Sequence, residues 1–264
     1  MAEQEKQAGA SLVELSSKEH AALKMNPLSA LKVAEAQHII NLKVSEVGMA
    51  ASSFPIFMSR ANDDADWTIS AINSFELNSN LFVDGNEWTG THLPISMQTY
   101  PFFLMRKEGD DKNFTIGINP QSEAFSEEEG EFLFDENGKA SIRLSQATAQ
   151  LEVQIQNDMQ SYKFAKKLEE LGLIKSIDLL VQYRGGKINT LKGLNTIDEE
   201  KFVALSSDVF EELRQAGYLA PIYSMLTSIY QFNNLIKRHN KRFTDNIVAQ
   251  VKLEVPKEEG DATA

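Results

Sequence analysis

The apolar residues in the first half of the chain come in short runs, which predicts strands. Between about residues 36 and 135 these runs are bounded by turn-forming residues, a texture typical of β-structure. Trp67 to Ile72 alternates large and small side chains, and the run at 80–83 leads into Asp84-Gly85-Asn86 before Trp88. Because Asp-Gly accommodates positive φ angles, we expect a hairpin turn there.

Two further hairpins are predicted by the same signals. The first spans 102–118 around Glu108 to Asp111, and the second spans 177–194 around Arg184-Gly185-Gly186. Glycine relieves the steric cost of a tight turn. The second hairpin lies among helical segments, so strands are not confined to the first half.

The second half of the chain is otherwise helical in pattern. From Leu144 onward, apolar residues recur every three or four positions, which predicts an amphipathic helix over 144–172. Gly172 can end this helix in the left-handed conformation. The apolar stripe consists of Leu151, Ile155, Met159, Tyr162, Ala165 and Leu168.

Two more helices are predicted beyond residue 200. Asp208 followed by Glu211 resembles a capping box, which would open a helix that ends near Gly217. Pro221 suits the first turn of a second helix over 219–242. The apolar face of that helix comprises Ile222, Leu226, Ile229, Phe232 and Ile236. Its end carries cations that complement the negative pole of a helix dipole, namely Lys237, Arg238, Lys241 and Arg242.

The order of these elements indicates the fold class. No ten-residue helical pattern separates successive strands in the first half, which disfavours a parallel sheet. We expect an α+β fold with an antiparallel sheet packed against several helices, the helices being concentrated in the C-terminal half. One domain is expected over 21–252, with flexible tails at 1–20 and 253–264 that lack periodic apolar spacing.

Composition and charge exclude several classes of function. The formal net charge is −12, which disfavours nucleic acid and anionic lipid surfaces as partners. The absence of cysteine removes disulfides and thiolate chemistry. No apolar run approaches the roughly 20 residues of a transmembrane helix, and the polar N-terminus does not resemble a signal peptide. A cytoplasmic location is therefore expected.

Motifs that carry known chemistry are absent from the sequence. The four histidines are His20, His38, His92 and His239, and none begins an HExxH or HxH pattern. No glycine-rich phosphate loop and no GxSxG turn is present. We therefore predict no metal and no cofactor, although a site assembled from distant residues stays open.

Several segments in a fixed order connect the chain to a family. They cover roughly residues 20–240 and comprise Asn80-Leu81-Phe82-Val83-Asp84 with Trp88, Tyr100-Pro101-Phe102, Phe134-Asp135 with Gly138, Leu171-Gly172-Leu173, Asp198-Glu199-Glu200-Lys201 with Leu205, and a final helix with Tyr223, Leu226, Ser228 and Asn233. In these segments the chain resembles SapC proteins, the bacterial family named for surface-layer loci. The resemblance implies an association with cell-envelope or surface-layer systems and supplies no reaction.

Two hypotheses of function follow. The first is a non-enzymatic binding or accessory protein whose partner is another protein or a small apolar ligand, bound on a surface around Asp84, Trp88, His92, Tyr100 and Phe102. The alternative is an enzyme whose site is assembled around Asp84, His92 and Tyr100. A histidine buried beside a carboxylate in a cleft would favour catalysis. The oligomeric state stays open.

Overall fold

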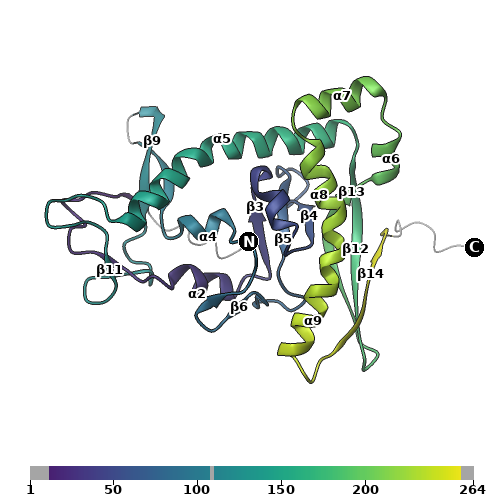
Figure 1. The fold of residues 1–264 in the computed structure, drawn as a ribbon, viewed down its shortest axis with the longest axis horizontal. Helices are drawn as coiled ribbons and strands as arrows, with labels where there is room; N and C mark the ends of the chain where they lie inside the picture. The colour runs from purple at the N-terminus through teal and green to yellow at the C-terminus, as the bar shows by residue number, and fades with distance from the viewer. Residues whose placement is uncertain (1–11, 108–109, 257–264) are drawn as a thin grey trace, which may run out of the picture.

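A six-stranded antiparallel sheet forms the centre of the protein, whose computed structural model describes residues 12–107 and 110–256 (Figure 1). The strand order is β14-β12-β13-β4-β5-β3. The strands are β3 (Ile39–Leu42), β4 (Ile56–Ser59), β5 (Thr68–Ile72), β12 (Ile174–Tyr183), β13 (Ile188–Ile197) and β14 (Val248–Glu254). Segments far apart in the sequence thus share one sheet, and the predicted antiparallel α+β class is confirmed.

Helices α8 (Leu219–Ser228) and α9 (Phe232–Arg242) pack over one face of this sheet. Their buried residues, including Ile222 and Leu235, join Phe57 and Val181 in the largest hydrophobic core. The remaining helices are α2 (Ser29–Glu35), α3 (Val47–Ala50), α4 (Ile95–Thr99), α5 (Ile142–Glu170), α6 (Glu199–Val203), α7 (Ser207–Gln215) and the 3-10 turns η1 (Val44–Glu46) and η2 (Ile229–Gln231). None of the helices in the described residues is long and apolar enough to cross a bilayer.

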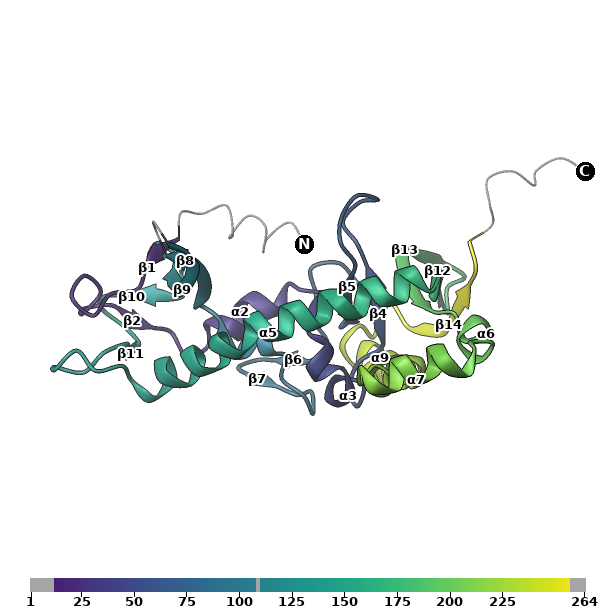
Figure 2. The same cartoon turned by 90° about the horizontal axis from the view of Figure 1, so that it is seen from above.

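The predicted helix over 144–172 is α5, which runs along the length of the molecule (Figure 2). Its first half contributes Leu144, Ala147 and Leu151 to a second core, and its last turns contribute Phe164, Ala165 and Leu168 to the main core. Between these ends the predicted apolar stripe is wrong, since Met159 and Tyr162 are 55% and 49% exposed. The middle of α5 lies between the two cores, so these two side chains stay largely in contact with solvent. The expected glycine cap is confirmed by the φ of +62° at Gly172.

Short strands build the second core, which lies at the other end of α5. They form the sheets β1-β9-β8 and β10-β2-β11. Their bounds are β1 (Val13–Glu14), β2 (Lys24–Met25), β8 (Phe103–Lys107), β9 (Asp110–Ile118), β10 (Phe125–Ser126) and β11 (Glu131–Phe132). The hairpin predicted over 102–118 is confirmed as β8 and β9, and its turn at Glu108 and Gly109 lies outside the described residues.

The expected boundaries of the tails need correction. Val13 pairs with Ile118, so the fold begins before residue 21. At the other end, β14 continues to Glu254, with Leu253 paired to Leu179. Two-residue strands and exposed edge strands carry too few apolar residues to show a period. The single domain expected over 21–252 stays a prediction, because two cores joined by α5 are present.

Two helix boundaries also differ from expectation. The N-cap of α7 is Ser206, whose hydroxyl accepts a hydrogen bond from Val209 N, so the capping box predicted at Asp208 is wrong. The helix expected over 219–242 is divided by η2. The division follows Ser228, whose buried hydroxyl donates to Met225 O and accepts from Ile56 N. The hairpin over 177–194 is confirmed as β12 and β13.

Candidate functional site

The small hairpin of β6 (Val83–Asp84) and β7 (Glu87–Trp88) separates two hollows in the surface. Its turn is the predicted one, with Gly85 at a φ of +58°. The fully buried Asn80 anchors the entry to the hairpin: its amide donates to Ala34 O, and its side-chain oxygen accepts from Phe82 N. This local bonding fixes the hairpin against the core.

Trp88 is held in place by aromatic packing and by one hydrogen bond. Its ring centroid lies 6.0 Å from that of Phe54 and 5.8 Å from that of Phe82. Its indole Nε1 donates to His92 O over 2.8 Å. Trp88 contacts both the main core and a smaller cluster of Ala34, Ile40, Val83 and Met97. The indole is therefore a rigid wall with one face toward the interior.

His92 is buried beside a carboxylate that sequence reasoning did not identify. Glu46 is 1% exposed, and its Oε2 lies 2.7 Å from His92 Nε2. The same carboxylate accepts from Ile95 N at 2.9 Å and from Lys43 N at 2.8 Å. Neither residue lines the two hollows beside the hairpin. The pair joins η1 to the start of α4. Both carboxylate oxygens of Glu46 already accept hydrogen bonds from backbone N–H groups of the protein.

The first hollow, the Trp88 groove, lies between α2, α4 and the first turns of α5. Its volume is about 530 Å³. The apolar wall consists of Pro27, Ala30, Leu31, Trp88, Leu93, Met97 and Ala147, and the polar wall consists of Gln98, Arg143, Gln146 and Gln150. Pockets for small organic ligands have this size and this combination of apolar walls with a few polar groups.

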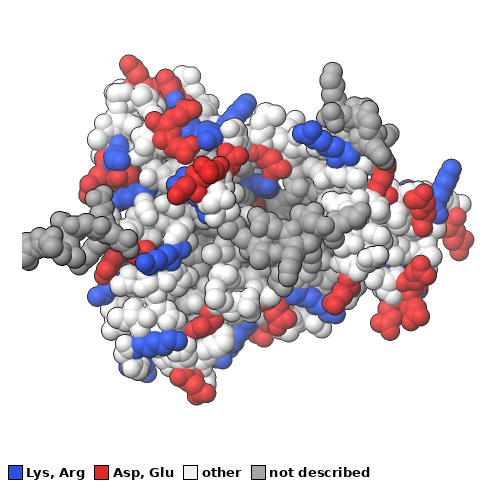
Figure 3. Space-filling view, turned by 180° about the vertical axis from the view of Figure 1, so that it is seen from behind, with Lys and Arg blue, Asp and Glu red and all other residues white. Residues whose placement is uncertain are grey.

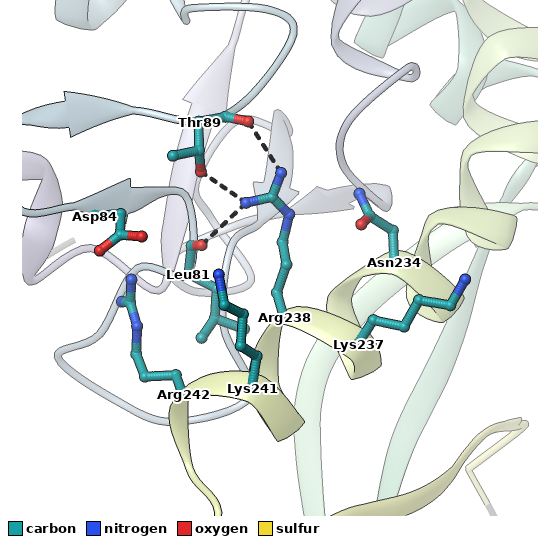
Figure 4. A pocket seen from close by; sticks show the side chains of 8 residues that line it. All are labelled: Leu81, Asp84, Thr89, Asn234, Lys237, Arg238, Lys241 and Arg242. Carbon is teal, nitrogen blue, oxygen red and sulfur yellow. Dashed lines mark hydrogen bonds between the residues drawn. The ribbon is translucent and has the colours of Figure 1, made fainter.

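The second hollow, the basic pocket, lies between α9 and the 80–89 segment (Figure 4). Its volume is about 520 Å³, and it is lined by Leu81, Asp84, Thr89, Asn234, Lys237, Arg238, Lys241 and Arg242. Burial, and then the nearby charge of Arg242, lowers the pKa of Arg238 below its usual value. On the back of the molecule, by contrast, acidic and basic side chains are interspersed over the visible described surface (Figure 3).

The five residues predicted to form one site lie in different places. Asp84 lines the basic pocket, Trp88 lines the Trp88 groove and His92 pairs with Glu46. Tyr100 is half-buried, with its hydroxyl 3.3 Å from Ser122 Oγ, and Phe102 is core packed against Phe125. Among the described residues, no hydrogen bond joins Asp84, His92 and Tyr100 to one another.

Sequence reasoning interpreted the four cations of α9 only as partners of the helix dipole. These cations are separated by one, three and four positions, which places them along one side of a helix. This spacing is the feature of the sequence that could have indicated a shared basic pocket. For Glu46 no such signal existed, because its partner His92 is 46 residues away along the chain.

Comparison with known proteins gives one match. The family model SapC matches residues 15–235, which is most of the chain. No curated protein and no solved structure matches the chain.

Proposed function

The chain belongs to the SapC family, and from that premise we propose that it is a non-enzymatic binding or accessory protein of a cell-envelope or surface-layer system. Its ligand in this proposal is a small apolar molecule held in the Trp88 groove. The observation that carries the proposal is the groove itself: its volume suits a small ligand, and the fixed indole of Trp88 forms part of its apolar wall. The cell-envelope link rests on the family alone.

The lining of the groove supports a ligand with an apolar body and one polar group. Leu31, Leu93 and Met97 supply apolar surface beside Trp88. Burial of apolar area contributes about 25 cal/mol per Å² to binding. Arg143 donates to Pro27 O at 3.2 Å and makes no ion pair with the described residues, so its remaining donors can orient a polar group.

The surroundings of His92 support the non-enzymatic side of the proposal. A general base needs access to the proton that it removes. Glu46 already accepts two backbone N–H groups and faces His92, and both side chains are buried away from the two hollows. A structural role for this pair, which holds η1 against the start of α4, accounts for its geometry without a substrate.

The ligand proposal is tested with Trp88 as reporter. The variant Trp67→Phe leaves Trp88 as the single tryptophan, since the chain has two. The neutral apolar probe N-phenyl-1-naphthylamine should then bind and accept excitation energy from Trp88, with saturation at one probe per chain. If the probe produced no saturable energy transfer from Trp88, the apolar-ligand proposal would be refuted.

A matched pair of leucine variants localises the binding. Leu31→Gln replaces part of the groove wall with an amide, and probe affinity should fall about tenfold, since loss of a buried leucine side chain is worth about 1.5 kcal/mol or more. Leu77→Gln makes the same change at a leucine that is 74% exposed and lies outside the groove. The control should bind as the parent does. Equal losses in both variants would place the probe elsewhere.

The cell-envelope link is tested in the native host. We propose that the protein works from the cytoplasm, so fractionation of intact cells should recover it there. Affinity capture of the tagged protein followed by mass spectrometry should recover a component of a surface-layer or envelope system. Detection in the surface fraction would contradict the location, and capture of no envelope component in repeated experiments would contradict the link.

A further inference from the structure

The basic pocket concentrates positive charge in an acidic protein. Four cationic side chains and one carboxylate line it, so its lining carries a formal charge of +3 within a chain of net charge −12. Cations near the end of α9 do stabilise the helix dipole. Dipole stabilisation accounts for their sign, but it does not require that they surround a hollow of about 520 Å³.

The two arginines are fixed in the wall of the pocket. Arg238 donates to Thr89 Oγ1 at 2.7 Å and to Thr89 O at 3.0 Å, and its guanidinium lies 4.3 Å from the ring centroid of Phe82. Arg242 donates to Asn80 O at 2.6 Å and also to Val83 O. These acceptors are neutral, and neither guanidinium group lies within 4.0 Å of a described carboxylate. Each guanidinium also has more N–H donors than these contacts use.

The two lysines have no anionic partner in the described part of the chain. Lys237 and Lys241 are exposed, and neither lies within 4.0 Å of a described carboxylate. Figure 4 shows Lys241 extending between the guanidinium groups of Arg238 and Arg242, while Lys237 extends toward the side of Asn234. Lys241 therefore belongs to a group of three like charges, none of which forms an ion pair with a described carboxylate.

We propose that the basic pocket binds a small soluble molecule that bears a phosphate or pyrophosphate group. A multiply charged anion matches a lining of +3 better than a single carboxylate does. Lysine ammonium groups and free guanidinium N–H groups are the donors that proteins use for phosphate oxygens. The volume leaves room for an organic part beside the phosphate. The strongly negative net charge favours a soluble ligand over a phospholipid surface.

Inorganic pyrophosphate is the probe, and calorimetric titration of the full chain is the measurement. Lys241→Gln should weaken binding about tenfold, because one charge-assisted hydrogen bond is lost. Lys237→Gln should weaken it only about twofold to threefold, since this lysine lies at the rim and is screened by solvent. The matched control is Lys252→Gln on the exposed strand β14, which should bind as the parent does.

Asp84→Asn provides a test in the opposite direction. Asp84 is the only carboxylate among the lining residues described, so its neutralisation should tighten pyrophosphate binding several-fold. A variant that merely damaged the fold would not gain affinity. The four variants, at Asp84, Lys237, Lys241 and Lys252, all change exposed side chains. Their free energies of unfolding in urea should therefore equal that of the parent.

Two comparison arms distinguish the ligand classes. Citrate carries similar charge without phosphorus and should bind more weakly than pyrophosphate. Vesicles of phosphatidylcholine with phosphatidic acid should not retain the protein. The proposal is overturned if pyrophosphate does not bind, if Lys241→Gln leaves its affinity unchanged, if citrate binds more tightly, or if only the vesicles bind. The Trp88 groove and its probe play no part in these outcomes.

Discussion

The buried carboxylate of Glu46 gives the sharpest test of the structural role assigned to the Glu46–His92 pair. The perturbation is Glu46→Ala, which removes the acceptor for Lys43 N and Ile95 N and leaves His92 Nε2 without its neighbour. All three contacts lie between 2.7 and 2.9 Å, and the side chain is 1% exposed. Truncation should therefore destabilise the protein without changing the lining of either hollow.

The magnitude follows from the groups that lose their partner. A buried polar group left unsatisfied costs about 1–3 kcal/mol. Lys43 and Ile95 are only partly buried, so water can reach their N–H groups in part, and the lower end of that range applies to each. With the buried imidazole included, Glu46→Ala should lower the free energy of unfolding by about 3 kcal/mol.

Urea denaturation followed by circular dichroism measures this loss. Glu46→Gln should lose about half as much, because its amide oxygen can still accept one backbone N–H while its NH₂ group faces another donor. Glu87→Ala, at an exposed glutamate of β7, should change stability by less than about 0.5 kcal/mol. A loss below about 1 kcal/mol for Glu46→Ala would refute the reasoning. Full stability combined with lost binding of N-phenyl-1-naphthylamine would instead assign Glu46 a functional role.

Three further predictions concern stability. Burial, and then the hydrogen bond to Glu76, raises the pKa of Tyr183 to about 12. As the pH rises, the tyrosine of the unfolded chain ionises before that of the folded protein. The stability that this group contributes is therefore present below about pH 10 and is lost as the pH rises toward 12. Tyr183→Phe should therefore flatten the dependence of the urea midpoint on pH in this window. Phe82→Ala, which removes the fully buried ring beside Phe54 and Trp88, should cost about 3–5 kcal/mol in urea unfolding. Ser206→Ala should cost about 1 kcal/mol as the loss of an N-cap, whereas Asp208→Ala should cost less than half of that; the reverse order in thermal unfolding would restore the capping box at Asp208.

Local signals predicted the local structure well. The turn at Gly85, the cap at Gly172 and the antiparallel hairpins were all readable, because each depends on a few adjacent residues. The apolar stripe predicted along the middle of α5 is wrong, because periodicity indicates which residues a helix can bury and not what lies beside them. The N-cap of α7 was misplaced by two residues, since Ser206 and Asp208 both have side chains that can cap.

The candidate sites show a different limit of sequence reasoning. Asp84, Trp88, His92 and Tyr100 lie within 17 consecutive positions, from 84 to 100, and this proximity suggested one surface. Asp84 and Trp88 on the hairpin, His92 before α4 and Tyr100 after α4 all point to different places, so nearness in sequence did not produce a shared site. The cations of α9 come together with Asp84 only because the helix packs beside the 80–89 segment.

By itself, the sequence determined the fold class, the main turns, the absence of thiol chemistry and the membership suggested by ordered segments, because these depend on composition and on neighbours along the chain. The tertiary structure alone decided that Glu46 is the partner of His92 and that Trp88 and Asp84 open onto different hollows. It also brought Lys241, the two arginines and Asp84 around one pocket. Glu46 and His92 are 46 positions apart, and Arg238 and Thr89 are 149 positions apart, so only tertiary packing brings their side chains within hydrogen-bonding distance.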